Sequence, residues 1–131
     1  MIYDIVIADD NRVIREGIRR LIDEESDGLA VSGEAADGLE VLALMEKHQP
    51  DLVILDISMP RMSGIEAARQ IRSLYPQIKI LIFTMYEDPE YQDEALAAGV
   101  DGYLLKTDSS AEFLSAIERI RRGEVYLSRL S

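Results

Sequence analysis

The sequence predicts an α/β fold in which helices cover both faces of a parallel β-sheet. Apolar runs alternate five times with segments of helical period, a pattern typical of strand–helix repeats joined by right-handed crossovers. Residues 52–55 are four apolar residues in a row, as expected of a strand buried on both faces. With 131 residues and a hydrophobic fraction of 47%, the chain is long enough for one domain with a substantial core.

The first half of the chain contains three predicted strands, at residues 2–8, 29–33 and 52–55. After the first strand, apolar residues recur at i, i+4, i+7 and i+8, which indicates a helix with one buried stripe. These residues are Ile14, Ile18, Leu21 and Ile22. Asp37 is the expected N-cap of a second helix, and Pro50 ends that segment before the third strand.

The second half contains two further strands, at residues 79–83 and 101–105. Ser63 can cap the helix between the third and fourth strands. The Asp88-Pro89 pair is typical of an N-cap followed by a proline in the first helical turn, so a fourth helix is expected there.

The last predicted helix begins at Ser109 or Ser110, and Gly123 fits its C-terminal end. The residues after Gly123 show no clear terminal element. They are typical of a domain that is cut at the start of a linker.

Charge and composition exclude several classes of function. The formal net charge is -11, from 25 acidic and 14 basic residues, so the domain itself is not expected to bind DNA or RNA. The absence of cysteine excludes a disulfide framework and a thiolate metal site. No apolar run approaches the ~20 residues of a membrane helix, and the N-terminus lacks a signal-peptide pattern. We expect a cytoplasmic chain without a membrane association.

Polar side chains follow four of the predicted strands. Asp9 and Asp10 follow the first strand, Asp56 the third, Thr84 ends the fourth and Lys106 follows the fifth. Parallel strands bring their carboxyl ends to one edge, where open α/β sheets bind ligands. Three carboxylates there repel one another, and oxygen ligands select Mg²⁺ or Ca²⁺ over zinc. The residues at this edge therefore predict a cation site. Its nucleophilic carboxylate, its ammonium and its hydroxyl would suit a phosphoryl group.

Each of these residues alone has an ordinary structural explanation. Asp9, Asp10 or Asp56 could cap a helix or occupy a turn, Thr84 could bond to the backbone, and Lys106 could be a solvated charge. Their joint occurrence at successive strand ends is what favours a functional site.

Four motifs lie at these strand ends. They are Asp9-Asp10, Leu-Asp-Ile-Ser-Met-Pro-Arg-Met-Ser-Gly at 55–64, Thr84, and Gly-Tyr-Leu-Leu-Lys at 102–106. Together they resemble the receiver domains of two-component response regulators, over residues 1–123. Residues 97–106 are similar to the NarL/LuxR branch of that family.

The resemblance implies a flavodoxin-like (βα)5 doubly wound parallel sheet with strand order 2-1-3-4-5. Residues 1–124 would form the receiver domain, and residues 125–131 would begin a linker to an absent C-terminal domain. In the NarL/LuxR branch that domain is a helix-turn-helix DNA-binding domain. DNA would be a partner only through it.

The resemblance also implies a chemistry. A sensor histidine kinase would transfer a phosphoryl group to Asp56, giving an acyl phosphate. Asp10, Asp56 and the backbone carbonyl of Ser58 would bind Mg²⁺ directly, Asp9 would act mainly through a bound water, and Lys106 would pair with the phosphoryl oxygens. The domain would catalyse only its own phosphorylation and dephosphorylation, as a phosphoacceptor signalling domain rather than an enzyme.

The same resemblance implies a switch. Thr84 would move toward the phosphoryl group, and Tyr103 would rotate inward behind it. The helix at 88–98 and the last strand and helix would then present a changed surface that controls transcription. Phosphorylation would alter homodimerisation or release the output domain, and the sequence does not select the dimer surface.

Three positions near the site bear on its local chemistry. Thr107 follows Lys106 where many receivers have a proline after a cis peptide. A cis bond before a non-proline residue costs ~2.5–4 kcal/mol, so a trans bond is expected. Ser58 and Tyr86 occupy the two positions that tune attack by water in this family, and Tyr86 is expected to screen the phosphoryl group and slow its hydrolysis.

Other classes of function are also open to test. A phosphohydrolase of the haloacid-dehalogenase type needs a second aspartate two residues after the nucleophile, where this sequence has Ser58. A flavodoxin-like cofactor binder needs a small phosphate loop after the first strand, but the carboxylates of Asp9 and Asp10 would repel phosphate. A pseudo-receiver that acts only as an interaction module would not take up phosphate from acetyl phosphate.

Overall fold

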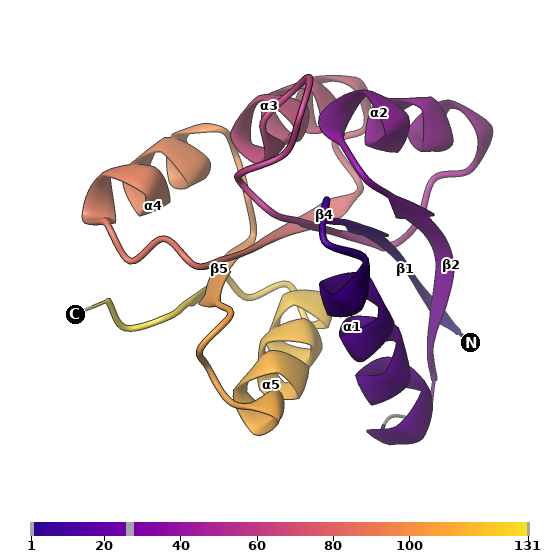
Figure 1. The fold of residues 1–131 in the computed structure, drawn as a ribbon, viewed down its shortest axis with the longest axis vertical. Helices are drawn as coiled ribbons and strands as arrows, with labels where there is room; N and C mark the ends of the chain where they lie inside the picture. The colour runs from indigo at the N-terminus through magenta and orange to yellow at the C-terminus, as the bar shows by residue number, and fades with distance from the viewer. Residues whose placement is uncertain (1, 26–27, 131) are drawn as a thin grey trace.

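The computed structural model describes residues 2–25 and 28–130. Its centre is one sheet of six parallel strands in the order β2-β1-β3-β4-β5-β6 (Figure 1). The strands are β1 (Tyr3–Ala8), β2 (Leu29–Ala35), β3 (Leu52–Leu55), β4 (Lys79–Thr84), β5 (Gly102–Leu105) and β6 (Tyr126–Leu127). The predicted α/β fold and the order of its first five strands are confirmed.

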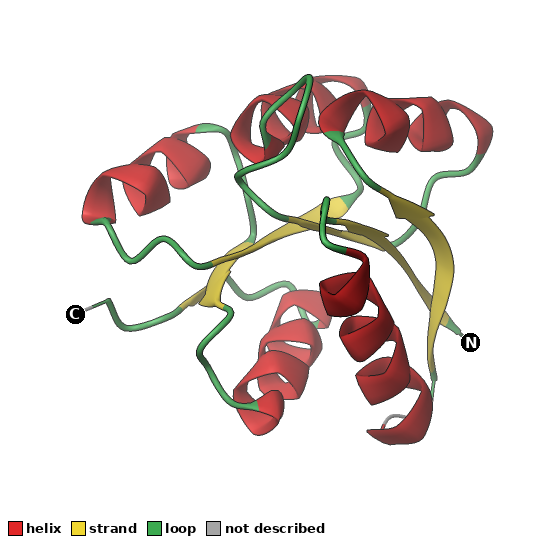
Figure 2. Ribbon diagram, in the orientation of Figure 1, coloured by secondary structure: helices red, strands yellow, loops and turns green. Residues whose placement is uncertain are grey.

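In the described part of the chain, five helices connect the strands and cover the sheet on both faces. They are α1 (Arg12–Glu25), α2 (Gly38–Lys47), α3 (Gly64–Leu74), α4 (Pro89–Ala97) and α5 (Ser110–Arg121). Helices α1 and α5 lie on one face, and α2, α3 and α4 lie on the other (Figure 2). Among the described residues, no helix has both the length and the apolar character needed to cross a membrane.

The core consists of two layers, one on each face of the sheet. In β3, Val53 and Leu55 pack into the layer beneath α2, α3 and α4. Leu52 and Ile54 pack into the layer beneath α1 and α5. All four side chains are at most 1% exposed, which confirms a strand buried on both faces and explains its unbroken apolar run.

Three helices begin at the N-cap residues that the sequence predicts. The capping side chain accepts a hydrogen bond from the backbone N–H three residues later, at 2.9 Å for Asp37, 3.2 Å for Ser63 and 3.1 Å for Ser109. Asp88 occupies the N-cap position of α4, but its side chain makes no capping hydrogen bond to a described residue. Helix α4 is therefore started by the proline at its first position rather than by a side-chain cap.

The sixth strand is a difference from the sequence-based expectation of no terminal element. β6 pairs with β5 in parallel, with Gly102 opposite Tyr126. The backbone N–H of Ser128 continues this pairing by donating to the carbonyl of Tyr103 at 2.8 Å. Two residues are too few to show the alternation of a strand, so only the tertiary contacts reveal β6. Residues 126–128 therefore pack onto the domain rather than leaving it directly as a linker.

Candidate functional site

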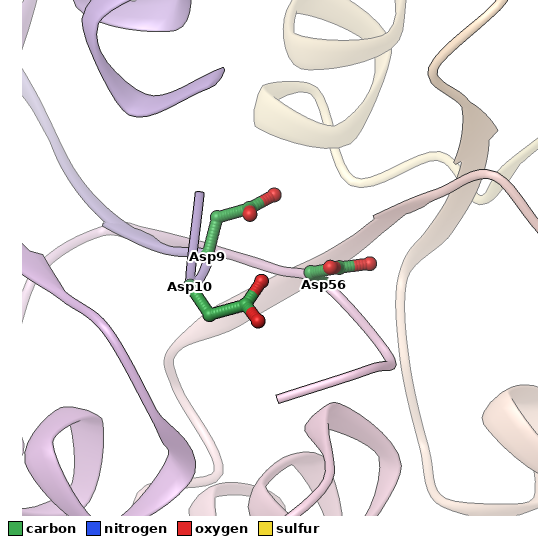
Figure 3. A group of neighbouring side chains, drawn as sticks. All are labelled: Asp9, Asp10 and Asp56. Carbon is green, nitrogen blue, oxygen red and sulfur yellow. The ribbon is translucent and has the colours of Figure 1, made fainter. Parts of the chain in front are cut away.

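The carboxylates of Asp9, Asp10 and Asp56 meet at the carboxyl edge of the sheet (Figure 3). One carboxylate oxygen from each lies within 4.8 Å of the others. The strand register causes this, because Ala8 pairs with Leu55, and the backbone N–H of Asp56 donates to the carbonyl of Ala8 at 3.0 Å. The residues after the paired strands thus lie side by side. Asp9 and Asp56 are 2% and 7% exposed, whereas Asp10 is exposed to solvent.

Lys106 connects β5 to this acidic cluster. Its Nζ lies 2.7 Å from Oδ2 of Asp9 and 3.3 Å from Oδ2 of Asp56. Its backbone N–H donates to the carbonyl of Thr84 at 2.8 Å, which fixes the lysine at the end of β4. The structure therefore brings together the carboxylates and the ammonium that the sequence placed at separate strand ends.

Burial and charge act on the ionisation of this cluster. Burial raises the pKa of Asp56; Lys106 lowers it and the charge of Asp9 raises it again, and the net shift is upward. Burial lowers the pKa of Lys106, but its hydrogen bond to Asp9 and the charge of Asp56 outweigh that effect and raise it overall. One ammonium cannot neutralise three carboxylates, so the pocket keeps an excess of negative charge.

The cluster fits a hard divalent cation. All three side chains offer oxygen ligands from within one small volume, which is the donor set that Mg²⁺ accepts. The exposure of Asp10 leaves a path from solvent to the pocket. Asp9, Asp10 and Asp56 are the residues that could hold such an ion.

Two hydrogen bonds that the sequence does not predict hold Asp9 in place. Oδ1 of Asp9 accepts a hydrogen bond from the backbone N–H of Asn11 at 2.9 Å. Nη1 of Arg15, in α1, donates to the backbone carbonyl of Asp9 at 2.5 Å. Arg15 also bonds to Glu34 at 3.0 Å. The position of Arg15 in the predicted helix does not indicate this contact with Asp9, because the contact depends on how α1 packs against the end of β1.

Thr84 ends β4, where its carbonyl accepts from the backbone N–H of Lys106, and Tyr103 lies in β5; both residues are 0% exposed. Oγ1 of Thr84 accepts a hydrogen bond from the backbone N–H of Tyr86 at 3.2 Å. The hydroxyl of Tyr103 donates to the backbone carbonyl of Tyr86 at 2.7 Å. Burial, with the charge of Asp88 and the neighbouring Tyr91, raises the pKa of Tyr103 to about 12. Both side chains thus contact the same short segment that leads into α4.

The β3–α3 loop, residues 57–63, continues from Asp56 and carries Ser58. The backbone N–H of Gly64 donates to the carbonyl of Ile57 at 3.0 Å, which closes the loop on itself. A Cβ at Gly64 would lie 1.9 Å from the carbonyl oxygen of Asp56, so only glycine fits. The peptide bond between Lys106 and Thr107 is trans, as expected.

The sequence has relatives among transcriptional regulators. It is 44% identical over 120 residues to the uncharacterized transcriptional regulatory protein YxjL of Bacillus subtilis (strain 168), covering 92% of this chain and 55% of the relative. It is 41% identical over 124 residues to the oxygen regulatory protein NreC of Staphylococcus carnosus (strain TM300), covering 94% and 57%. The chain thus spans little more than half the length of these relatives.

Solved structures show the same fold. A two-component response regulator of the LuxR family from Aurantimonas sp. SI85-9A1 matches with a TM-score of 0.92 and 41% identity, covering 98% of this chain and 91% of that one. A DNA-binding response regulator of the LuxR family from Staphylococcus aureus matches with a TM-score of 0.86 and 33% identity, covering 91% and 98%. Residues 5–118 match the family described as the response regulator receiver domain. The chain therefore belongs to the response regulator receiver domain family, and its relatives lie in the NarL/LuxR group.

Proposed function

We propose that Asp56 accepts a phosphoryl group in a Mg²⁺-dependent reaction and that this modification switches the surface of the domain. The observation that carries the proposal is the position of Asp56, a buried carboxylate with Lys106 at 3.3 Å and two further aspartates around it. A pocket built only to stabilise the fold would not gather three carboxylates around one ammonium, because the uncompensated charge is costly.

Each residue of the site has a separate role in the proposed phosphoryl transfer. A carboxylate oxygen of Asp56 attacks the phosphorus of a phosphohistidine on a sensor histidine kinase. An O–P bond forms, the N–P bond breaks, and the released histidine nitrogen takes up a proton. Lys106 then pairs with the phosphoryl oxygens. Asp10, Asp56 and the backbone carbonyl of Ser58 would hold the cation directly, and Asp9 would act mainly through a bound water. Mg²⁺ supplies positive charge that offsets the negative charge of the transferred group.

Thr84 and Tyr103 carry the resulting change to the surface. Thr84 turns its hydroxyl toward the phosphoryl oxygens, which ends its bond to the Tyr86 N–H. Tyr103 follows, because its hydroxyl is bonded to the carbonyl of the same residue. Tyr103 is already inward in this structure, so its response is a repacking within the segment before α4 rather than a movement from solvent to core. Helix α4 moves readily, because Ala95 is its one buried residue among those described.

The output is transcriptional. The relatives are named as transcriptional or oxygen regulatory proteins, and this chain covers about half of each. We place an effector domain of the helix-turn-helix class beyond residues 125–131. These residues would begin the linker to it, although residues 126–128 still pack against β5. Phosphorylation favours a homodimer or frees that domain, and DNA is bound only by it.

Acetyl phosphate tests the phosphoacceptor directly. With Mg²⁺, the chain should gain the mass of one phosphoryl group, and the Asp56→Asn variant should not. Adding EDTA should abolish the gain in the unaltered protein. Failure to take up the group at any Mg²⁺ concentration would favour a pseudo-receiver that acts only as an interaction module. Equal uptake by Asp56→Asn would mean that a residue other than Asp56 accepts the group.

A further inference from the structure

Asp37 and Arg61 join two loops that lie next to the acidic cluster. Nε and Nη2 of Arg61 donate to Oδ2 of Asp37 at 2.9 and 2.6 Å. The other oxygen of Asp37 is occupied as the N-cap of α2. Asp37 is 5% exposed, so the arginine closes over a buried carboxylate. The segment before α2 and the β3–α3 loop are thus held together at one point.

The backbone at this point adopts a conformation that most residues avoid. Arg61 has φ of 66°, and among the described non-glycine residues it alone has a positive φ. Such a conformation is strained and persists only where surrounding contacts enforce it. Its hydrogen bonds to Asp37 are contacts of that kind.

Backbone packing keeps the same two segments in close contact. A Cβ at Gly38 would lie 2.5 Å from the carbonyl oxygen of Met62, so the two segments touch without room for a side chain between them. The Asp37–Arg61 pair and the contact of Gly38 with Met62 therefore fix the β3–α3 loop at residues 61–62, here called its outer end. Its inner end is fixed by Gly64 against Asp56.

We propose that Asp37 and Arg61 are positioning residues for cation binding, holding the β3–α3 loop so that the carbonyl of Ser58 faces the cluster. This inference rests on the proposed function, because it assumes that the cluster binds Mg²⁺. The loop has anchors at both ends and Ser58 lies between them. Loosening the outer anchor therefore lets the carbonyl move while Asp9, Asp10 and Asp56 stay at the ends of β1 and β3. Neither residue touches the cation.

Electrostatics alone predicts the opposite change in Mg²⁺ affinity when Arg61 is removed, so the two explanations can be told apart by experiment. Removing the positive charge of Arg61 from the neighbourhood of a cation site should strengthen Mg²⁺ binding. If the arginine positions the loop, its removal should instead weaken binding. The sign of the change in Mg²⁺ affinity therefore separates the two explanations.

The test uses Arg61→Gly and Arg61→Asn, because both residues tolerate a positive φ and neither reaches Asp37 with two donors. Mg²⁺ affinity is measured on the unphosphorylated chain by following backbone amide chemical shifts during titration with MgCl2. Both variants should bind about 10-fold more weakly, as loss of an outer partner of a metal ligand typically does. Affinity equal to or tighter than that of the unaltered chain would overturn the inference.

Two controls isolate the position of the arginine. Arg69→Ala removes a guanidinium of similar exposure from α3, where it faces Glu66 at 3.9 Å, and should leave the affinity unchanged. Asp37→Asn keeps an oxygen for the helix cap but removes the charged partner. Adding it to Arg61→Gly should cause little further loss if the two residues act as a unit.

The rate of phosphorylation by acetyl phosphate gives a second readout. In Arg61→Gly the Mg²⁺ concentration for half-maximal rate should rise, and the maximal rate at saturating Mg²⁺ should match the unaltered chain. A maximal rate that stays low would contradict a role confined to cation positioning. If the unaltered chain binds Mg²⁺ but takes up no phosphoryl group, the proposed function fails, and the titration still decides this inference.

Discussion

Lys106 lies closer to Asp9 than to Asp56, with its Nζ at 2.7 Å from the first carboxylate and 3.3 Å from the second. The ammonium is therefore the principal compensating charge for two buried carboxylates. It would remain available to the phosphoryl group proposed on Asp56, because the longer of its two contacts is the one to that residue. Stability and function are linked through this one side chain.

Replacing Lys106 with methionine should destabilise the chain by about 3 kcal/mol in the absence of divalent cations, because removing one partner leaves buried charges uncompensated. Urea unfolding in EDTA measures the change. Mg²⁺ should restore much of the loss, since an ion that binds only the folded state stabilises it. An equal loss with and without Mg²⁺ would contradict the idea that the lysine and the cation share the same carboxylates.

The raised pKa of Asp56 predicts a pH dependence of stability. As pH rises past the ordinary value of 3.8, the unfolded chain releases this proton while the folded chain keeps it. The folded state then binds more protons, so the free energy of unfolding falls with pH until the raised pKa is passed. The Asp56→Asn variant lacks this pH-dependent fall in the free energy of unfolding. Its stability relative to the unaltered chain should therefore increase between pH 3.8 and the raised pKa of Asp56, and then stay constant.

Urea unfolding of both proteins in EDTA, at a series of pH values from acid to neutral, checks this behaviour. Subtracting the two curves removes the contributions of all other groups that titrate alike in both. A difference that does not change with pH would show that the pKa of Asp56 is the same in the folded and unfolded chains.

Tyr86 should lengthen the life of the phosphorylated form. Its ring stacks on that of Tyr91, with centroids 4.6 Å apart and planes at 27°, and its backbone joins Thr84 and Tyr103. We expect this held ring to limit the approach of water to the acyl phosphate proposed at Asp56. Tyr86→Ala should therefore lose the group several-fold faster, as followed by intact mass after removal of acetyl phosphate. Tyr91→Phe keeps the stacking partner and should leave the lifetime unchanged.

Gly64 and Gly17 form a matched pair for a test of the backbone contact at the site. Alanine at Gly64 would place its Cβ 1.9 Å from the carbonyl of Asp56, whereas at Gly17, in α1, nothing lies within 4 Å. Gly17→Ala should stabilise the chain by about 0.5–1 kcal/mol, because alanine is the better helix former. Gly64→Ala should instead destabilise the chain, by several times the amount that Gly17→Ala stabilises it. Thermal unfolding measures both changes. Similar effects of the two substitutions would mean that the loop can move away from Asp56.

The sequence was sufficient to predict the elements whose pattern is local. The continuous apolar run at 52–55 identified a central strand, and the rule that parallel strands share one edge brought Asp9, Asp56 and Lys106 together. The register between β1 and β3, in which Ala8 pairs with Leu55, places Asp9 next to Asp56. These predictions succeed because periodicity and topology alone determine where a strand ends.

Other features depend on contacts between distant residues and left no local pattern. Arg61 meets a partner 24 positions away, in a backbone conformation that favours glycine or asparagine rather than arginine. The strand β6 has two residues, too few for a period. Asp88 has the type and position of an N-cap, yet its side chain makes no capping bond to a described residue.

Ser128 should hold β6 against the domain. Its backbone N–H bonds to the carbonyl of Tyr103 at 2.8 Å, its hydroxyl accepts from the N–H of Leu105 at 3.2 Å, and the same hydroxyl donates to the carboxylate of Asp108. The residue is 8% exposed, so these bonds are largely shielded from water. Removing a shielded hydroxyl costs about 1 kcal/mol, which is a large part of the stability of a two-residue edge strand.

Ser128→Ala should therefore speed amide hydrogen exchange at Tyr126 and Ser128 while leaving the amides of β3 unchanged, because local opening of an edge does not require global unfolding. Ser128→Thr keeps a hydroxyl and should retain most of the protection. If Ser128→Ala exchanges as slowly as the unaltered chain, the backbone pairing of β6 with β5 is sufficient by itself. If β3 exchanges faster as well, the serine supports the whole domain rather than its terminal strand.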